Sequence, residues 1–162
     1  MSILTCGFTG YRPSKLPKEP DKLEEVKRNI AKQIDLAISA GYKHFISGFA
    51  LGSDLYFAEE VLKAKKKHPH IILEAAIACE TQSSRWSESD RGCYFDLLIR
   101  CDIKTYINYE YHPNCYLERN DYIISQANRL ICVYDGKRGG TMYTVNRAKE
   151  KGIEIFIIKP TL

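Results

Sequence analysis

Residues 129–158 read RLICVYDGKRGGTMYTVNRAKEKGIEIFII and contain, in order, an apolar run, a glycine-rich loop, a helical pattern and a second apolar run. Residues 129–134 and 153–158 have the short apolar character of buried strands, and helical spacing covers 141–151, with Gly152 as a stop signal. Two strands joined by a helix form the repeating unit of parallel α/β sheets. This segment therefore predicts a βαβ unit with a glycine-rich loop after its first strand.

The rest of the chain shows the same alternation. Apolar runs typical of strands occur at residues 3–8, 43–47, 71–78 and 103–107. The intervening helices are marked by Leu23, Val26, Ile30, Ile34 and Ala37, by Leu55, Ala58 and Leu62, by Tyr94, Leu97, Leu98 and Cys101, and by residues 115–127. We therefore predict one Rossmann-like α/β domain over 1–162, in three layers, with a mostly parallel sheet of about six strands flanked by helices.

The composition excludes several classes of protein. The 162 residues are 44% hydrophobic and 27% charged, which is ordinary for a globular domain and excludes disordered and collagen-like chains. No run of about 18 apolar residues is present, so we expect no membrane partner. The first residues lack the basic and apolar regions of a signal peptide. The net charge of +4 is small, and we do not expect nucleic acid as a partner.

The six cysteines contain no C-x-x-C pair, which a local zinc site needs. His68 and His70 come nearest to a ligand pair, but they lie in a lysine-rich turn, so we expect no metal site. We interpret the cysteines as reduced, mostly buried thiols of a cytoplasmic protein.

Three loops that follow predicted strands carry residues suited to an anionic ligand. In a doubly wound sheet the ligand lies at the carboxyl ends of the strands, near a change in strand order. Glycines let the backbone approach a ligand, arginine forms charge-assisted hydrogen bonds, and helix starts attract anions. The candidate binding residues are Gly7, Thr9, Gly10 and Arg12 in the first loop, Ser47, Gly48, Ala50, Gly52 and Asp54 in the second, and Asp135, Gly136, Gly139, Gly140 and Thr141 in the third. Together they predict a phosphate-containing ligand.

Some of these residues have a second interpretation. Ser53 or Asp54 is expected to cap the helix that follows, so Asp54 is either an N-cap or a ligand contact. Asp135 either accepts hydrogen bonds from a ribose or belongs to a plain Asp-Gly turn. Glu59 either reaches the same cleft or lies on the surface. The lysine-rich run 63–67 lies at the far end of its helix, where cations suit the helix dipole.

Three further candidate binding residues lie outside these loops. Gln82 and Trp86 are four residues apart, so we expect them to share a helix face. Trp86 is interpreted first as a packing anchor and second as a platform for a base. Arg119 and Asn120, near the start of a predicted helix, offer a cation and an amide to the ligand or to an acidic neighbour.

Taken together, the candidate motifs resemble one family over essentially the whole chain. They are Gly7-Phe8-Thr9-Gly10-Tyr11-Arg12-Pro13, Ser47-Gly48-Phe49-Ala50-Leu51-Gly52-Ser53-Asp54, Gln82 with Trp86, Arg119-Asn120, and Tyr134-Asp135-Gly136 with Gly139-Gly140-Thr141. In this order they resemble the YpsA-like branch of the SLOG superfamily. The resemblance implies a Rossmann-like fold and a nucleotide ligand related to ADP-ribose, in a protein from a bacterium or phage. It implies no other cofactor.

One motif departs from the LOG enzymes of the same superfamily. Their glycine-rich loop reads P-G-G-x-G-T-x-x-E, and the glutamate serves cleavage of a nucleotide N-glycosidic bond. Here Thr144 stands three residues after Thr141, and a threonine cannot replace that carboxylate. The sequence therefore assigns no catalytic residue, although Asp54 or Glu59 could supply a carboxylate from another loop.

Three functions remain open at this point. The first is binding of a nucleotide as a sensor, regulator or sink. The second is hydrolysis of an N-glycosidic or phosphate bond in a nucleotide, and the third is binding of single-stranded DNA, as in the related DprA. We also expect a homo-oligomer, since Tyr109 and Tyr111 lie in a loop suited to packing on a partner subunit.

Overall fold

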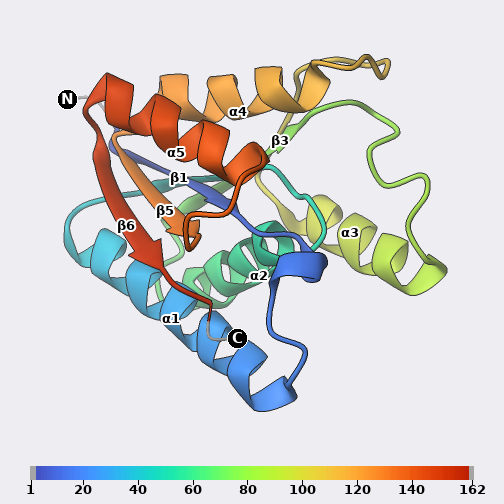
Figure 1. The fold of residues 1–162 in the computed structure, drawn as a ribbon. Helices are drawn as coiled ribbons and strands as arrows, with labels where there is room; N and C mark the ends of the chain where they lie inside the picture. Colours follow the sequence, from blue (N-terminus) through green and yellow to red (C-terminus); the bar gives the residue numbers. More distant parts are fainter. Residues whose placement is uncertain (1–2, 161–162) are drawn as a thin grey trace.

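A sheet of six parallel strands forms the centre of the computed structural model, which describes residues 3–160 (Figure 1). The strands are β1 (Thr5–Gly10), β2 (His44–Ser47), β3 (Ile72–Ile77), β4 (Ile103–Tyr106), β5 (Arg129–Val133) and β6 (Glu154–Ile158). The helices are α1 (Pro20–Ser39), α2 (Ser53–Lys65), α3 (Glu88–Arg100), α4 (Cys115–Gln126) and α5 (Gly140–Lys151), with a short 3-10 turn at Pro13–Lys15. The predicted α/β class and strand–helix order are confirmed.

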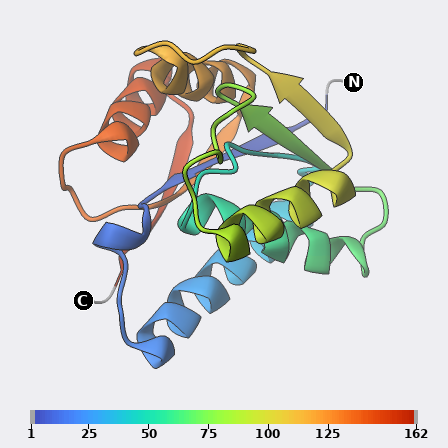
Figure 2. The same ribbon diagram turned by 90° about the vertical axis from the view of Figure 1, so that its right-hand side faces the viewer.

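The strand order is β4-β3-β2-β1-β5-β6, so the chain moves outward from β1 to β4 and then returns to the other side of β1. Helices α1, α2 and α3 cover one face of the sheet, and α4 and α5 cover the other (Figures 1 and 2). Gly10 at the end of β1 pairs in register with Val133 at the end of β5. The change in strand order therefore lies between β1 and β5, where ligands bind in sheets of this type.

The central strands are apolar because helices cover them on both sides. Every residue of β5 is buried, and so is every residue of β3 after Ile72. Phe8 of β1 stacks on Phe57 of α2, with ring centroids 4.5 Å apart. Burying one such phenylalanine contributes about 1.5–3 kcal/mol to folding. These contacts fix α2 against the sheet and so place its first turn beside the end of β1.

The start of α2 differs from the prediction that Ser53 or Asp54 caps it. The N-cap is Gly52, which has a φ of 98° and no side chain. Ser53 instead donates a hydrogen bond to the carbonyl oxygen of Tyr11, and a carboxylate oxygen of Asp54 accepts one from the Ala50 N–H at 3.2 Å. Both side chains are used to join loops, and this contact between distant segments overrides the local capping preference.

The segment after β3 also differs from its prediction, because Gln82 and Trp86 do not share a helix. Residues 80–85 form turns, in which the N–H groups of Gln82, Ser84 and Trp86 each bond to the carbonyl three residues earlier. The Gln82 amide is buried and bonded to backbone on two sides, and this holds the turns in place. Trp86 is half-buried, with its ring centroid 5.2 Å from that of Tyr94.

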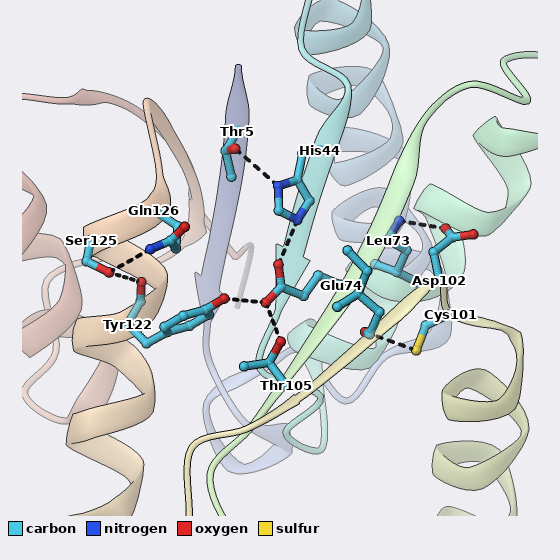
Figure 3. Close-up of polar contacts among 11 residues, drawn as sticks. Thr5, His44, Leu73, Glu74, Cys101, Asp102, Thr105, Tyr122, Ser125 and Gln126 are labelled. Carbon is cyan, nitrogen blue, oxygen red and sulfur yellow. Dashed lines mark hydrogen bonds and ion pairs between the residues drawn. The ribbon is translucent and has the colours of Figure 1, made fainter. Parts of the chain in front are cut away.

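A charged network lies between the sheet and α4, toward the amino ends of the strands (Figure 3). Glu74 of β3 is 2% exposed, and its carboxylate accepts hydrogen bonds from Tyr122 at 2.6 Å and Thr105 at 2.7 Å. His44 Nε2 lies 2.7 Å from the same carboxylate. Burial alone would raise the pKa of Glu74, but these three partners lower it below its ordinary value. The sequence analysis did not identify Glu74, because the strand pattern around it is apolar.

Two other expectations concern membrane-spanning helices and the state of the cysteines. No helix among residues 3–160 is long and apolar enough to cross a membrane. All six cysteines are free thiols, and all but Cys93 are buried, as predicted.

Candidate functional site

The three candidate loops are joined by Tyr11, which is 2% exposed. Its hydroxyl donates to Asp135 Oδ1 at 2.6 Å and accepts from the backbone N–H groups of Asp135 at 3.1 Å and Lys137 at 3.0 Å. Its carbonyl oxygen accepts from the N–H of Ser53 at 3.1 Å. One residue therefore holds the loop after β1 against both the start of α2 and the loop after β5.

A cavity of about 330 Å³ opens where these loops meet, at the carboxyl end of β1. Its lining combines predicted and unpredicted residues. The predicted ones are Thr9, Gly10, Arg12, Ala50, Asp54, Arg119, Asn120, Gly140 and Thr141. The others are Tyr11, Ser14, Lys15, Tyr116 and Leu117. We call this space the anion cavity.

The residues that the sequence analysis missed lie next to ones that it identified. Ser14 and Lys15 form the 3-10 turn that follows the first loop. Tyr116 and Leu117 lie in the first turn of α4, three residues before Arg119 and Asn120 respectively. Residues three apart share a helix face, so that spacing was the signal that could have identified them.

The other predicted residues do not line the anion cavity. They are Gly7, Ser47, Gly48, Gly52, Gln82, Asp135, Gly136 and Gly139. Several of them hold the loops. The Ser47 hydroxyl donates to the carbonyl of Asp54 at 2.9 Å, and the Gln82 amide donates to the carbonyls of Gly48 and Phe49 at 3.0 Å each. The space beside Gly7 is filled by Ile123, so it is closed to a ligand.

Gly48 makes room for the side chain of Arg119. A Cβ atom at Gly48 would lie 2.5 Å from a guanidinium nitrogen of Arg119, which is closer than real contacts allow. Arg119 is 3% exposed, and it donates to the carbonyls of Gly48 at 2.5 Å and Ala76 at 3.3 Å. Its Nε donates to Asn120 Oδ1 at 2.9 Å. The wall of the cavity thus contains a cation whose position is fixed by three acceptor groups of the chain.

Asp54 is the only carboxylate among the described residues that line the cavity. Burial raises its pKa above the ordinary value, although the guanidiniums of Arg119 and Arg12 and the Ala50 N–H act in the opposite direction. Burial likewise lowers the pKa of Arg119, and Asp54 opposes that shift. Glu59, the alternative carboxylate, has a side chain 45% exposed and pairs with Lys63 at 3.7 Å, outside the cavity.

The start of α5 contributes unoccupied backbone donors. Its N-cap is Gly139, with a φ of 145° that favours glycine, and no side chain caps the helix. The first turn contains no acidic residue, and Gly140 and Thr141 line the cavity. The space where a Cβ would stand on Gly140 is open, since the nearest side-chain atom is Asn120 Nδ2 at 3.9 Å. The exposed N–H groups and the positive end of the helix dipole favour an anion here.

Two more cations border this helix start. Arg12 is exposed, and its guanidinium lies 5.3 Å from the centre of the Tyr116 ring. Lys15 Nζ donates to the carbonyl of Arg138 at 2.5 Å. Lys63 and Lys65, in contrast, lie in the last turn of α2 as predicted, and Lys65 pairs with Asp102. The positive charge at the cavity therefore comes from the loops and α4.

Residues 3–160 contain no cluster of three His, Cys, Asp or Glu side chains suited to a metal.

An all-parallel sheet with a basic, helix-bordered cavity at its change in strand order defines a Rossmann-like α/β protein. The YpsA family model, described as the YspA SLOG family, matches residues 6–160. This chain belongs to that family, as the sequence motifs indicated.

Similar proteins come from bacteria and a prophage. UPF0398 protein BH1768 of Halalkalibacterium halodurans is 30% identical over 158 residues, which cover 93% of this chain and 82% of that one. The SPbeta prophage-derived protein YoqJ of Bacillus subtilis is 30% identical over 145 residues, covering 82% and 85% of the two chains.

Solved structures of low sequence identity share the fold. DprA from Streptococcus pneumoniae has a TM-score of 0.67 and 16% identity, over 99% of this chain and 52% of that one, so this chain spans about half of that protein. DprA from Helicobacter pylori has a TM-score of 0.62 and 18% identity, over 95% and 64% of the chains. That structure is described as showing a single-stranded DNA binding mode. Our expectation that nucleic acid is not a partner therefore gains no support from these comparisons.

Proposed function

We propose that this chain binds a nucleotide-type ligand in the anion cavity, with a phosphate at the start of α5. The observation that carries the proposal is the meeting of the uncapped start of α5 with Arg12, Lys15 and Arg119 in one cavity at the change in strand order. Three cations face one carboxylate there, and the carboxylate has a raised pKa. This balance favours an anionic ligand.

The phosphate accepts hydrogen bonds from the N–H groups at Gly140 and Thr141. Arg12 closes on it from the opposite loop, because its guanidinium is exposed and has no ion-pair partner within 4.0 Å among residues 3–160. Arginine binds phosphate through two parallel hydrogen bonds, which a lysine cannot do. Arg119 contributes positive charge from the cavity wall. Its guanidinium does not extend to the phosphate, since the backbone carbonyls of Gly48 and Ala76 hold it.

The ribose lies against Asp54 and Asn120. The sequence analysis gave a ribose contact as one of two interpretations of Asp135, but the Tyr11 hydroxyl and Lys137 already occupy its carboxylate, at 2.6 Å and 2.9 Å. Asp54 lines the cavity and can accept a hydrogen bond from a ribose hydroxyl. Nucleotides related to ADP-ribose supply both a phosphate and a ribose. Under this proposal, the protein is a sensor, regulator or sink of such nucleotides.

A second candidate function is hydrolysis of the bound nucleotide. The observation that favours it is Asp54, a buried carboxyl with a raised pKa inside the cavity. Such a group can serve as a general base. We place binding first because Thr144, where LOG enzymes have glutamate, uses its hydroxyl to bond the carbonyl of Gly140 at 2.9 Å.

A titration of the native chain tests the proposal. Isothermal calorimetry with AMP, ADP-ribose and NAD should show saturable binding of at least one of them, and sodium sulfate should compete for the phosphate position. A ligand at 100 times its dissociation constant adds about 2.7 kcal/mol of stability, so the melting temperature should rise by about 5–10 °C. Flat calorimetric traces and unchanged melting with all three nucleotides would contradict the proposal.

A further inference from the structure

A second cavity of about 480 Å³ adjoins the first, and it differs in chemistry. It is lined by Cys79, Thr81, Gln82, Ser84, Arg85, Trp86, Tyr111 and Tyr116. Aromatic rings and hydroxyls therefore make up most of this lining, and Arg85 is its one cation among the described residues. We call this second space the aromatic cavity.

Tyr116 belongs to the lining of both cavities. Its ring lies 5.3 Å from the Arg12 guanidinium and 5.6 Å from that of Arg119, measured to the ring centre. Both guanidiniums lie within the distance of a cation–π contact, which favours this position of the ring. A single molecule that passes Tyr116 can therefore place a charged end in one cavity and a flat end in the other.

We propose that the aromatic cavity binds the base of a nucleotide whose phosphate lies in the anion cavity. This inference rests on the proposed function and adds the part of the ligand that the anion cavity does not recognise. Trp86 and Tyr111 supply flat apolar faces, and stacking on aromatic side chains is the general means by which proteins hold bases. The ligand is then a nucleotide rather than a sugar phosphate.

The polar residues of the aromatic cavity divide into a fixed and a free group. Both ends of the Gln82 amide are occupied, because it donates to two carbonyls and accepts from the Ala78 N–H at 3.0 Å. It shapes the wall and cannot read a base. Arg85 and Ser84 are exposed, and within residues 3–160 Arg85 forms no ion pair. Together with the Thr81 hydroxyl, which also lines this cavity, they are the groups left to bond the polar edge of a base.

Trp86 is both a packing residue and a wall of the cavity. Its ring meets Tyr94 edge to face at 5.2 Å, which fixes its orientation. A ring fixed before the ligand arrives loses little conformational entropy on stacking. Trp86 is also the only tryptophan of the chain, so tryptophan fluorescence reports on the surroundings of this one ring.

The experiment compares AMP with ribose 5-phosphate, which has the same phosphate but no base. Both are titrated into the native chain by calorimetry and by Trp86 fluorescence. We expect both to bind, AMP about five- to hundredfold more tightly, and only AMP to change the fluorescence. Tyr111→Ala, at a residue 63% exposed, should lower the affinity for AMP and leave ribose 5-phosphate unchanged. Tyr109→Ala, in the same loop but outside the cavity lining, is the matched control.

The outcomes separate this inference from the proposed function. Equal affinity for the two compounds, with no change in fluorescence, would overturn the base site and leave the anion cavity standing. Absence of binding by either compound and by the other nucleotides would overturn both. Fluorescence quenching by a single-stranded oligonucleotide but not by AMP would overturn the assignment to a nucleotide and indicate DNA binding instead.

Discussion

The hydroxyl of Tyr11 lies 2.6 Å from Oδ1 of Asp135, although the two residues are 124 positions apart in the sequence. The same hydroxyl accepts two backbone N–H groups from the loop after β5. The pair therefore fixes the distance between that loop and the loop after β1. Since Arg12 follows Tyr11 and Gly140 follows Asp135 by five residues, the bond also positions the two sides of the anion cavity.

Removal of this hydroxyl should loosen the site. Tyr11→Phe leaves the ring in place but deprives Asp135 and two N–H groups of their partner. The expected loss is about 1–3 kcal/mol in the free energy of unfolding, measured by urea denaturation. Affinity of the Tyr11→Phe protein for the nucleotide should fall as well, because the two sides of the anion cavity are then held less firmly. Tyr109→Phe, at a hydroxyl with no hydrogen-bond partner within residues 3–160, is the control and should change neither quantity. Unchanged stability of Tyr11→Phe would show that the bond does not hold the loops.

A negative charge at the start of α5 should block the phosphate. Gly140→Asp places a carboxylate in the open space beside the helix start, and an acidic residue there suits the helix dipole, so the chain should fold normally. Affinity for the nucleotide should fall about tenfold to a hundredfold by calorimetry, from charge repulsion. Gly140→Asn has nearly the same size without the charge and should lose much less. Equal losses in both variants would point to bulk rather than to an anion site.

Arg12 should contribute charge-assisted hydrogen bonds to the ligand. Arg12→Ala removes about 1.5–3 kcal/mol of such bonding, which is a loss of about tenfold to a hundredfold in affinity. Arg12→Lys should recover only part of it, because an ammonium cannot form the two parallel bonds of a guanidinium. Arg28→Ala, an exposed arginine of α1, is the matched control. Identical affinities of the Arg12→Ala and Arg28→Ala proteins would remove Arg12 from the site.

The Glu74 network should make stability depend on pH. The pKa of Glu74 is lower in the folded chain than in the unfolded chain, so ionised Glu74 stabilises the fold above its unfolded pKa of about 4.3. This stabilisation is lost as the pH falls through the lower, folded pKa. Glu74→Gln should therefore be less stable than the native chain near neutral pH, and the difference should shrink in acid. Urea denaturation of both proteins between about pH 7 and pH 3 measures it. A difference that does not change with pH would show that the charge of Glu74 is not what stabilises the fold.

Turnover of the nucleotide separates the two candidate functions. If the chain only binds, AMP incubated with it should release no more free base than AMP alone, as measured by liquid chromatography. Release above that control would favour the hydrolase. Asp54→Asn should then abolish the release while Glu59→Gln retains it, because only Asp54 lines the cavity. Loss in Glu59→Gln alone would contradict the placement of the site.

Local patterns were sufficient to predict the architecture. Strands and helices are indicated by the spacing of apolar residues along the chain. This spacing can be read from the sequence without knowing which elements pack against each other. Residues 129–158 were predicted as strand, loop, helix and strand, and the structure has β5, α5 and β6 there. The positions of two residue pairs were also predicted correctly. Arg119 and Asn120 lie near the start of α4, and Gly139 and Gly140 lie at the start of α5.

The interior of the site required the tertiary structure. The guanidinium of Arg119 meets the carbonyl of Gly48 across 71 positions, and no periodic pattern encodes that contact. The same limitation explains why Asp54 and Glu59 could not be distinguished. Sequence by itself determined which loops follow strands and which residue types they carry. Only the strand order, which returns the chain to the far side of β1, decided which of those residues share a cavity, because contacts between distant segments depend on the packing of whole elements.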